Sequence, residues 1–440
     1  MLAKNATPEP RMSSNRHGSK RPQTGIRRNV LTLTRPKYSE YRILPAFLPF
    51  RAGNSTQTTM FSLHPARTLV PILGLAALVL CAAGCGGGDS AGDTLRLAVA
   101  TPLEQFIGAQ TLRGAEFARD QLNAAGGIQG RMVELVPVTD SASAQRAVPV
   151  ADGFFADGSI LAVIGHSTSG ATLAAATIYN RGLPAVSPTA TSPEISEAGD
   201  WIFRIASSDA ANSAWLARFA LRELGSRAAI LYANEPYGRG LREGFGQAYL
   251  AGGGVLLEEY PYIEGETQNF EAYLLGIQAA GPDLIFVAGL DASAALIIQQ
   301  ARELNIDAPI IGGDGLLGLA GQDSVYDGTF VGLLYHPDVP GQAGRQFVES
   351  YRSAFGVPPD HFAALAYDAV MLVAQAAEEV GLNREKIRAY LEEVGSARSG
   401  FQGVSGLIAF DENGDPLEKS YAVGRIDGDR IELVSVEGGT

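Results

Sequence analysis

One stretch, residues 161–191, constrains the fold of this chain more than any other. An apolar run at residues 160–164 is short enough for a buried strand, and it ends at Gly165. An alanine-rich, helical segment follows at residues 171–179, and a second short strand at residues 184–186. This order predicts a parallel sheet, in which the loops that follow the two strands lie at the same edge.

Both of these loops carry hydroxyl side chains. Thr168 and Ser169 follow the first strand, and Thr191 follows the second. The N–H groups at a helix start carry partial positive charge, and each of the three hydroxyls can donate to a carboxylate oxygen. The edge therefore favours a small anion held by neutral donors, without a lysine or an arginine nearby.

Three other interpretations of the first loop stay open. Residues 165–172 resemble a phosphate-binding loop, but Ala171 stands where its lysine is needed. Residues 165–169 nearly match the turn that carries a hydrolase nucleophile, with Ser169 in place of its last glycine. The third interpretation is an ordinary strand-to-helix turn rich in capping residues.

Strands and helices alternate twice over residues 94–334. This order indicates an α/β fold with two lobes, each a parallel sheet covered by helices on both faces. Further helices are expected between residues 344 and 394, and Asn413-Gly414 is a strong hairpin signal. The glycines of residues 238–244 resemble a dinucleotide-binding fingerprint, although the third one comes a residue late.

The N-terminal part of the chain differs from the rest. Residues 69–83 are apolar, too short for a spanning helix and typical of a signal peptide, and small residues precede Cys85 as in a bacterial lipobox. We expect a lipoprotein signal peptide at residues 60–84, lipid on Cys85, and a flexible tether at residues 85–93. Residues 1–59 are expected to be a mispredicted or disordered extension. A single hydrophobic anchor helix is the alternative to the lipobox.

Charge and cysteine content exclude several classes of protein. The net charge is −13, yet 12 of the 34 basic residues and only two of the 47 acidic residues precede Cys85. The body of the chain is therefore acidic, and nucleic acid is not an expected partner. Of the two cysteines, Cys81 would leave with the signal peptide and Cys85 would carry lipid. The mature chain would then have no disulfide and no thiol metal site, and we expect neither a metal ion nor a cofactor.

Eight short segments resemble, in the same order, extracytoplasmic solute-binding proteins of the branched-chain amino acid (Leu/Ile/Val) type, which serve ABC importers. Eight such segments in the order of the family, preceded by a lipobox-like sequence, make this resemblance specific. The segments are AGGIQGR at 125–131, AVIGHSTSGAT at 162–172, AVSPTATSPEIS at 185–196, ANEPYGRGLREGF at 233–245, AAGPDLIFVAG at 279–289, IGGDG at 311–315, ALAYDAV at 364–370 and GLIAFDENGD at 406–415.

The resemblance implies a type I periplasmic binding protein fold. Two Rossmann-like lobes would be joined by three hinge crossings, near residues 207–211, 335–340 and 403–410, with the ligand in the cleft between them. The expected boundaries are residues 94–208 plus 338–405 for the first lobe and 209–337 plus 406–440 for the second.

The resemblance also implies which residues of the first lobe hold the backbone of the ligand. Thr168 and Ser169 match positions that donate to its carboxylate. Thr189 matches a backbone contact, and Thr191 a hydroxyl contact near the α-carbon. Thr191 could instead be part of a helix entry before Pro193.

Other matched positions lie around the rest of the ligand. Tyr237 matches an aromatic residue of the second lobe that closes over the ligand, and Asp314 matches the acid that pairs with the α-ammonium group. Each of these two could instead be an ordinary turn residue. Phe106, Ile107 and Leu290 match positions that contact the ligand side chain, where some amino-acid binders place aromatic residues.

The expected function is capture of a small amino acid or related carboxylate by hinge closure and its delivery to an ABC permease of the inner membrane. The protein would be exported and held at the cell envelope by its lipid alone, without catalysis. Two alternatives remain: a ligand-sensing domain that feeds a signalling partner, and a serine hydrolase that uses Ser167 with His336 or His361.

Overall fold

The structure is a computed structural model that describes residues 94–339, 344–417 and 419–437. The predictions for the extension, the signal peptide, Cys85 and the tether lie outside these residues. Within the described part of the chain, no helix has the length and apolar character needed to cross a membrane.

The first lobe is built on a five-stranded parallel sheet in the order β2-β1-β3-β4-β5. The middle strand β3 is buried along its whole length, as its apolar run predicts. The strands are β1 (Thr94–Thr101), β2 (Met132–Thr139), β3 (Ile160–Gly165), β4 (Ala185–Ser187) and β5 (Ile202–Arg204).

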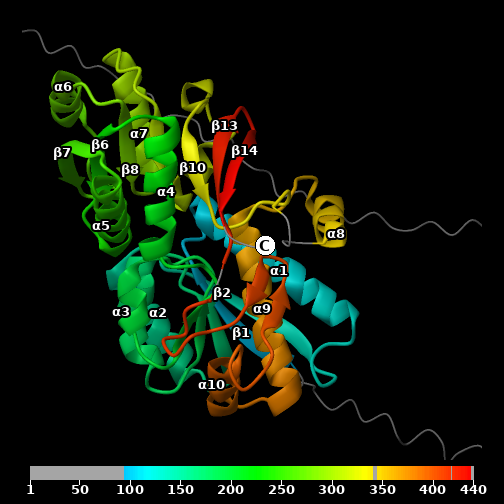
Figure 1. The fold of residues 1–440 in the computed structure, drawn as a ribbon. Helices are drawn as coiled ribbons and strands as arrows, with labels where there is room; N and C mark the ends of the chain where they lie inside the picture. Colours follow the sequence, from blue (N-terminus) through cyan, green and yellow to red (C-terminus); the bar gives the residue numbers. More distant parts are fainter. Residues whose placement is uncertain (1–93, 340–343, 418, 438–440) are drawn as a thin grey trace, which may run out of the picture. The chain divides into compact units, whose positions relative to one another are not determined.

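Helices from two separate parts of the chain pack with this sheet. The long apolar helix α9 packs along α1, so the late part of the chain returns to the first lobe (Figure 1). Phe117 of α1 also contacts Phe347 and Tyr351 of α8. The helices are α1 (Phe106–Ala124), α2 (Ala144–Ala156), α3 (Ser169–Tyr179), α8 (Arg345–Phe355), α9 (His361–Val380) and α10 (Arg384–Glu393), with the 3-10 helix η1 (Pro193–Glu197).

The second lobe has a seven-stranded sheet in the order β14-β13-β10-β9-β8-β6-β7. Its strands are β6 (Arg227–Ala233), β7 (Val255–Tyr262), β8 (Leu284–Ala288), β9 (Ile310–Gly312), β10 (Phe330–Leu333), β13 (Tyr421–Asp427) and β14 (Arg430–Glu437). Its helices are α4 (Asp209–Glu223), α5 (Pro236–Ala251), α6 (Glu271–Ala280), α7 (Asp291–Glu303), η2 (Asp314–Leu319) and η3 (Ser324–Tyr326).

The expectation of a purely parallel second sheet is wrong at one edge. β13 runs antiparallel to both β10 and β14. A turn of two residues, which includes Gly428 at φ 60°, joins β13 to β14. So short a connection can only produce an antiparallel pair, because a parallel pair needs a long crossover.

The chain crosses between the two sheets three times: between β5 and α4, between β10 and α8, and between the hairpin β11 (Phe401–Gly403) and β12 (Gly406–Ile408) and β13. The structure thus has the two lobes and three crossings of the predicted fold class. The residue at which each lobe begins and ends stays a proposal.

Two local predictions differ from the structure. No element is predicted for residues 140–159, yet α2 forms there around Pro149, capped by Ser143 and held by buried residues such as Phe154. Asn413-Gly414 does form a turn, but it is closed by a single isolated bridge rather than by two strands. The turn instead docks on β5, where the Gly414 carbonyl accepts a hydrogen bond of 3.1 Å from the Arg204 N–H.

Candidate ligand site between the lobes

The second lobe places a buried acid next to a buried phenol. Asp314 begins η2, directly after β9, and Tyr237 lies in the first turn of α5. The Tyr237 hydroxyl donates to Asp314 Oδ1 at 2.9 Å and accepts from the Gly315 N–H at 2.9 Å. Burial raises the pKa of Asp314 to about 6. Tyr237 is therefore not a surface turn residue, and Asp314 is buried as well.

A second buried acid, Asp209, lies at the first crossing, as the first residue of α4. The Thr191 hydroxyl donates to Asp209 Oδ2 at 2.8 Å, and the Asp209 N–H donates to the Thr191 carbonyl at 2.8 Å. Burial, and then the charge of Asp314, raise the pKa of Asp209 well above its usual value. The two acids therefore lie within each other's electric field.

This contact changes the role available to Thr191. A hydroxyl carries a single hydrogen, so Thr191 cannot donate to a ligand carboxylate while it donates to Asp209. Sequence reasoning missed Asp209 altogether. The signal that the chain offered was an aspartate after Ser208 at a helix start, which is how many ordinary helices begin.

The first-lobe loop presents the other predicted hydroxyls. Thr168 Oγ1 is buried without a hydrogen-bond partner among the described residues, at the N-terminus of α3. Ser169 Oγ accepts from the Ser192 N–H at 3.1 Å, which leaves its own hydrogen available to donate. Thr189 donates its hydroxyl to the Ser167 carbonyl at 2.8 Å, so a ligand would meet its backbone rather than its side chain.

The predicted side-chain contacts come together in one small cavity of about 10 Å³. Phe106 and Ile107 of α1 line it from the first lobe, and Leu290 lines it from the second. The other lining residues are Asp291, Gly315, Gly318 and Phe362. Gly315, which lines this cavity, donates its N–H to the Tyr237 hydroxyl. The largely apolar cavity therefore lies next to Tyr237 and Asp314, which form the acidic end of the site.

Comparison with known proteins identifies the family. The sequence model described as "Periplasmic binding protein" matches residues 98–430 of this chain. The chain belongs to the periplasmic binding protein family. Proteins of this family bind substrates for transport and are not enzymes.

The relatives of this periplasmic binding protein agree on its type. Leu/Ile/Val-binding protein homolog 1 of Brucella suis is 29% identical over 370 residues, which cover 81% of this chain and 95% of the relative. LivJ of Streptococcus pneumoniae, a branched-chain amino acid transporter substrate binding protein solved with isoleucine, has a TM-score of 0.72 and 27% identity, over 79% of this chain and 100% of LivJ.

A third relative extends this agreement. An ABC transporter substrate-binding protein from Desulfitobacterium hafniense, solved in complex with Leu, has a TM-score of 0.67 and 30% identity, over 78% of this chain and 100% of that chain. The fold and these similarities make the chain a type I periplasmic binding protein of the branched-chain amino acid type, a kind that serves ABC importers.

Among the described residues, Ser167 forms no hydrogen bond with either histidine of the hydrolase alternative. Ser167 Oγ contacts the hydroxyls of Thr101 at 2.8 Å and Thr111 at 3.3 Å. His336 instead contacts the Ile431 carbonyl through Nε2 at 3.3 Å, and both ring nitrogens of buried His361 lack a hydrogen-bond partner in the described part of the chain.

The glycines of residues 238–244 are explained by packing rather than by a dinucleotide. A Cβ atom on Gly238 would lie 2.2 Å from the Ala233 carbonyl oxygen, and one on Gly244 would lie 2.1 Å from Ser213 Oγ. These glycines let α5 approach β6 and α4 closely. Within residues 94–339, 344–417 and 419–437, no group of three or more His, Cys, Asp or Glu side chains could hold a metal ion.

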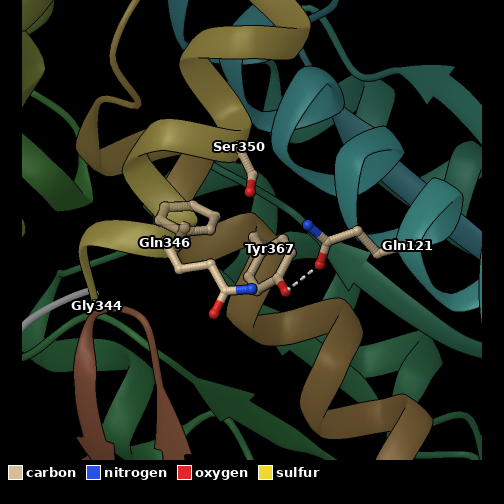
Figure 2. Close-up of a pocket in the computed structure, with 6 residues that line it drawn as sticks. Gln121, Gly344, Gln346, Ser350 and Tyr367 are labelled. Carbon is tan, nitrogen blue, oxygen red and sulfur yellow. Dashed lines mark hydrogen bonds between the residues drawn. The ribbon is translucent and has the colours of Figure 1, made fainter.

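A larger cavity, of about 290 Å³, lies apart from this site between α1, α8 and α9 (Figure 2). Its walls mix polar and aromatic side chains without a charged residue, and the Tyr367 hydroxyl donates to Gln121 Oε1 at 2.7 Å across it. All of its lining residues belong to helices of the first lobe or directly precede one, so closure of the second lobe would not cover a ligand there.

Proposed function

We propose that this protein captures a branched-chain or similarly small amino acid in the cleft between its lobes and delivers it to an ABC permease. The observation that carries this proposal is the adjacency of two unlike surfaces. Asp314 and Tyr237 form an acidic end, and a largely apolar cavity with walls from both lobes adjoins it through Gly315. An aliphatic amino acid has the matching charged and apolar ends.

Different residues would bind the carboxylate and the ammonium group of the ligand. Thr168 and Ser169, with the N–H groups that begin α3, would donate to the carboxylate, and the Thr189 backbone would lie beside it. Asp314, held by Tyr237, would accept from the ammonium group. Both charges must be compensated in this way, because burying an unpaired ion costs several kcal/mol, on the order of a weak ligand's whole affinity.

The apolar cavity would take the ligand side chain. Its present volume of about 10 Å³ corresponds to roughly one water molecule. An isobutyl group needs more room, so binding would require the lobes to separate and then close with slightly shifted walls. Phe106, Ile107 and Leu290 would set the size limit, and none of these side chains can hydrogen-bond to a polar ligand side chain.

The test is a thermal-shift screen followed by titration calorimetry. Leucine, isoleucine and valine should raise the melting temperature, because a ligand that binds the folded state stabilises it by mass action. Benzoate, which offers a carboxylate without an ammonium group, should have little effect. A protein that responds to none of the twenty amino acids would refute the proposal.

We also propose that the protein is exported and anchored by lipid on Cys85, as the lipobox-like sequence indicates. The chain then needs no catalytic activity of its own, because its task is to present the solute to the permease. Replacing Cys85 by alanine should release the protein from the membrane fraction on cell fractionation. Continued membrane association of Cys85→Ala would contradict lipid attachment at this cysteine.

A further inference from the structure

Arg204, the last residue of β5, has a fully buried side chain. Its guanidinium forks onto Asp415: Nε donates to Oδ1 and Nη2 donates to Oδ2, each at 2.6 Å. A buried arginine needs such a partner, because an unpaired charge away from water is strongly unfavourable. Asp415 lies in the third crossing, and Arg204 directly precedes the first. The ion pair therefore joins two of the three crossings.

The third arm of the guanidinium leads to a ligand-site loop. Nη1 of Arg204 donates to the Ser192 carbonyl at 2.8 Å, in the loop after β4 that also carries Thr191. The same carbonyl accepts from the Ile195 N–H at 3.1 Å, within η1. Two donors therefore hold Ser192, and the ring of the next residue, Pro193, restricts the backbone further.

Ser192 in turn contacts the hydroxyl proposed to donate to the ligand carboxylate. The Ser192 N–H donates to Ser169 Oγ at 3.1 Å, and both residues are buried. This bond uses a lone pair of Oγ and leaves its hydrogen available, so it orients the Ser169 hydroxyl as a donor. A continuous series of contacts thus runs from Asp415 through Arg204 and Ser192 to Ser169.

We propose that Arg204 is a positioning residue for the ligand carboxylate, one that links the third crossing to this end of the site. The inference rests on the proposed function. A binding group has to be held within about 0.5 Å of its productive place, and Arg204 fixes the residue that orients Ser169. Lysine cannot replace it, because a compact ammonium group lacks the planar fork that contacts both Asp415 oxygens and the Ser192 carbonyl together.

The experiment is titration of the full-length protein with leucine by calorimetry. The main variant combines Arg204→Met with Asp415→Leu. It leaves neither charge unpaired, and apolar residues of similar size often replace a buried ion pair without loss of stability. We expect its melting temperature without ligand to stay close to that of the unmodified protein, and its affinity for leucine to fall at least about tenfold.

Arg204→Lys provides a second test that keeps the buried positive charge. We expect it to weaken leucine binding as well, because the contact with the Ser192 carbonyl depends on the shape of the guanidinium. If the paired variant does not fold, this titration decides the question alone. Leucine affinity equal to that of the unmodified protein in Arg204→Lys would then overturn the proposal.

A double-mutant cycle with Ser169→Ala separates positioning from a purely structural role. If Arg204 acts through Ser169, adding Ser169→Ala to the paired variant should not weaken leucine binding beyond the worse of the two, whereas the effects on melting temperature should add. Losses of affinity that add fully would show that Arg204 does not act through Ser169 and would overturn the inference.

The matched control is Ser196→Ala. The Ser196 hydroxyl donates to Asp415 Oδ2 at 2.6 Å and accepts from Arg204 Nη2 at 3.1 Å, so it contacts the same ion pair but not the series that leads to Ser169. Its replacement should leave leucine affinity unchanged. A loss as large as that of the paired variant would mean that any disturbance of the ion pair weakens binding, which contradicts a specific role for the Ser192 contact.

The outcomes also distinguish this inference from the function on which it rests. If the unmodified protein binds leucine and the folded Arg204 variants bind it equally well, the inference fails and the proposed function stands. If the unmodified protein binds no amino acid, both proposals fall.

Discussion

At the scale of single residues, Asp314 carries the sharpest expectation for binding. Asp314→Ala removes the carboxylate that accepts from Tyr237 and leaves the ammonium group of a bound amino acid without its direct partner. We expect leucine affinity to fall at least about tenfold, or ~1.4 kcal/mol. Calorimetry checks this loss, with Asp283→Asn, directly before β8, as a control. An unchanged titration would remove Asp314 from the site.

The same carboxylate predicts a dependence on pH. Its pKa is raised to about 6 in the folded protein, so between about pH 4 and pH 6 the folded state holds a proton that the unfolded chain releases. The free energy of unfolding from this group therefore falls as pH rises through that range. An ammonium ligand prefers the ionised acid, so its binding follows the opposite trend.

We thus expect leucine affinity to decrease by up to about tenfold for each pH unit below 6, as one proton must be lost on binding. Calorimetry in buffers of different ionisation enthalpy would count that proton. Asp314→Asn should weaken binding at pH 7 and flatten this dependence. A full dependence that persists in Asp314→Asn would assign the titration to another group, such as Asp209.

At the scale of elements, the glycines of α5 control how closely this helix packs. A Cβ atom on Gly238 would meet the backbone oxygen of Ala233 at 2.2 Å, whereas one on Gly153, inside α2, would meet nothing within 4 Å. Gly238→Ala should lower the free energy of unfolding by about 1–3 kcal/mol. Gly153→Ala should raise it by about 0.5–1 kcal/mol, because alanine favours a helix. Chemical denaturation measures both, and equal effects would contradict this account.

Most of these elements could be predicted from the sequence because each has a local signal. The buried run of β3 and the glycines and prolines around β8 and β9 mark strands without reference to the rest of the fold. α2 could not be predicted from the sequence, because Pro149 lies in its interior and its stability comes from tertiary packing. The antiparallel edge of the second sheet depends on which strand β13 pairs with, and that pairing joins residues far apart in the sequence.

The residues of the candidate site also differ in whether a local sequence signal marks them. Thr168, Ser169 and Asp314 stand in motifs that a resemblance can match. Asp209 carries no motif, and its importance comes from burial and from a contact with Thr191, 18 positions earlier in the chain. The Thr191 hydroxyl bond to Asp209 likewise has no local sequence signal that could have predicted it.

At the scale of the whole molecule, α5 and η1 meet across the two lobes. A Cβ atom on Gly240 would lie 2.7 Å from Pro193 Cδ, which belongs to η1 of the first lobe. Gly240→Val should therefore act as a wedge that disfavours the closed arrangement. We expect weaker leucine binding and, by small-angle scattering, a larger radius of gyration with leucine present.

The matched control for this wedge lies on the same helix. A Cβ atom on Gly246 would face only the flexible end of Leu256, at 3.3 Å, within the second lobe. Gly246→Ala should leave both leucine affinity and the radius of gyration unchanged. A Gly240→Val variant with full affinity and an unchanged radius would show that this contact does not limit closure.

The small apolar cavity has a consequence for how cargo is handed over. Its walls belong to both lobes, so a side chain bound there would be covered from two sides. A bound solute would leave only after the two lobes separate. We therefore expect the rate of solute release to be set by the opening of the hinge.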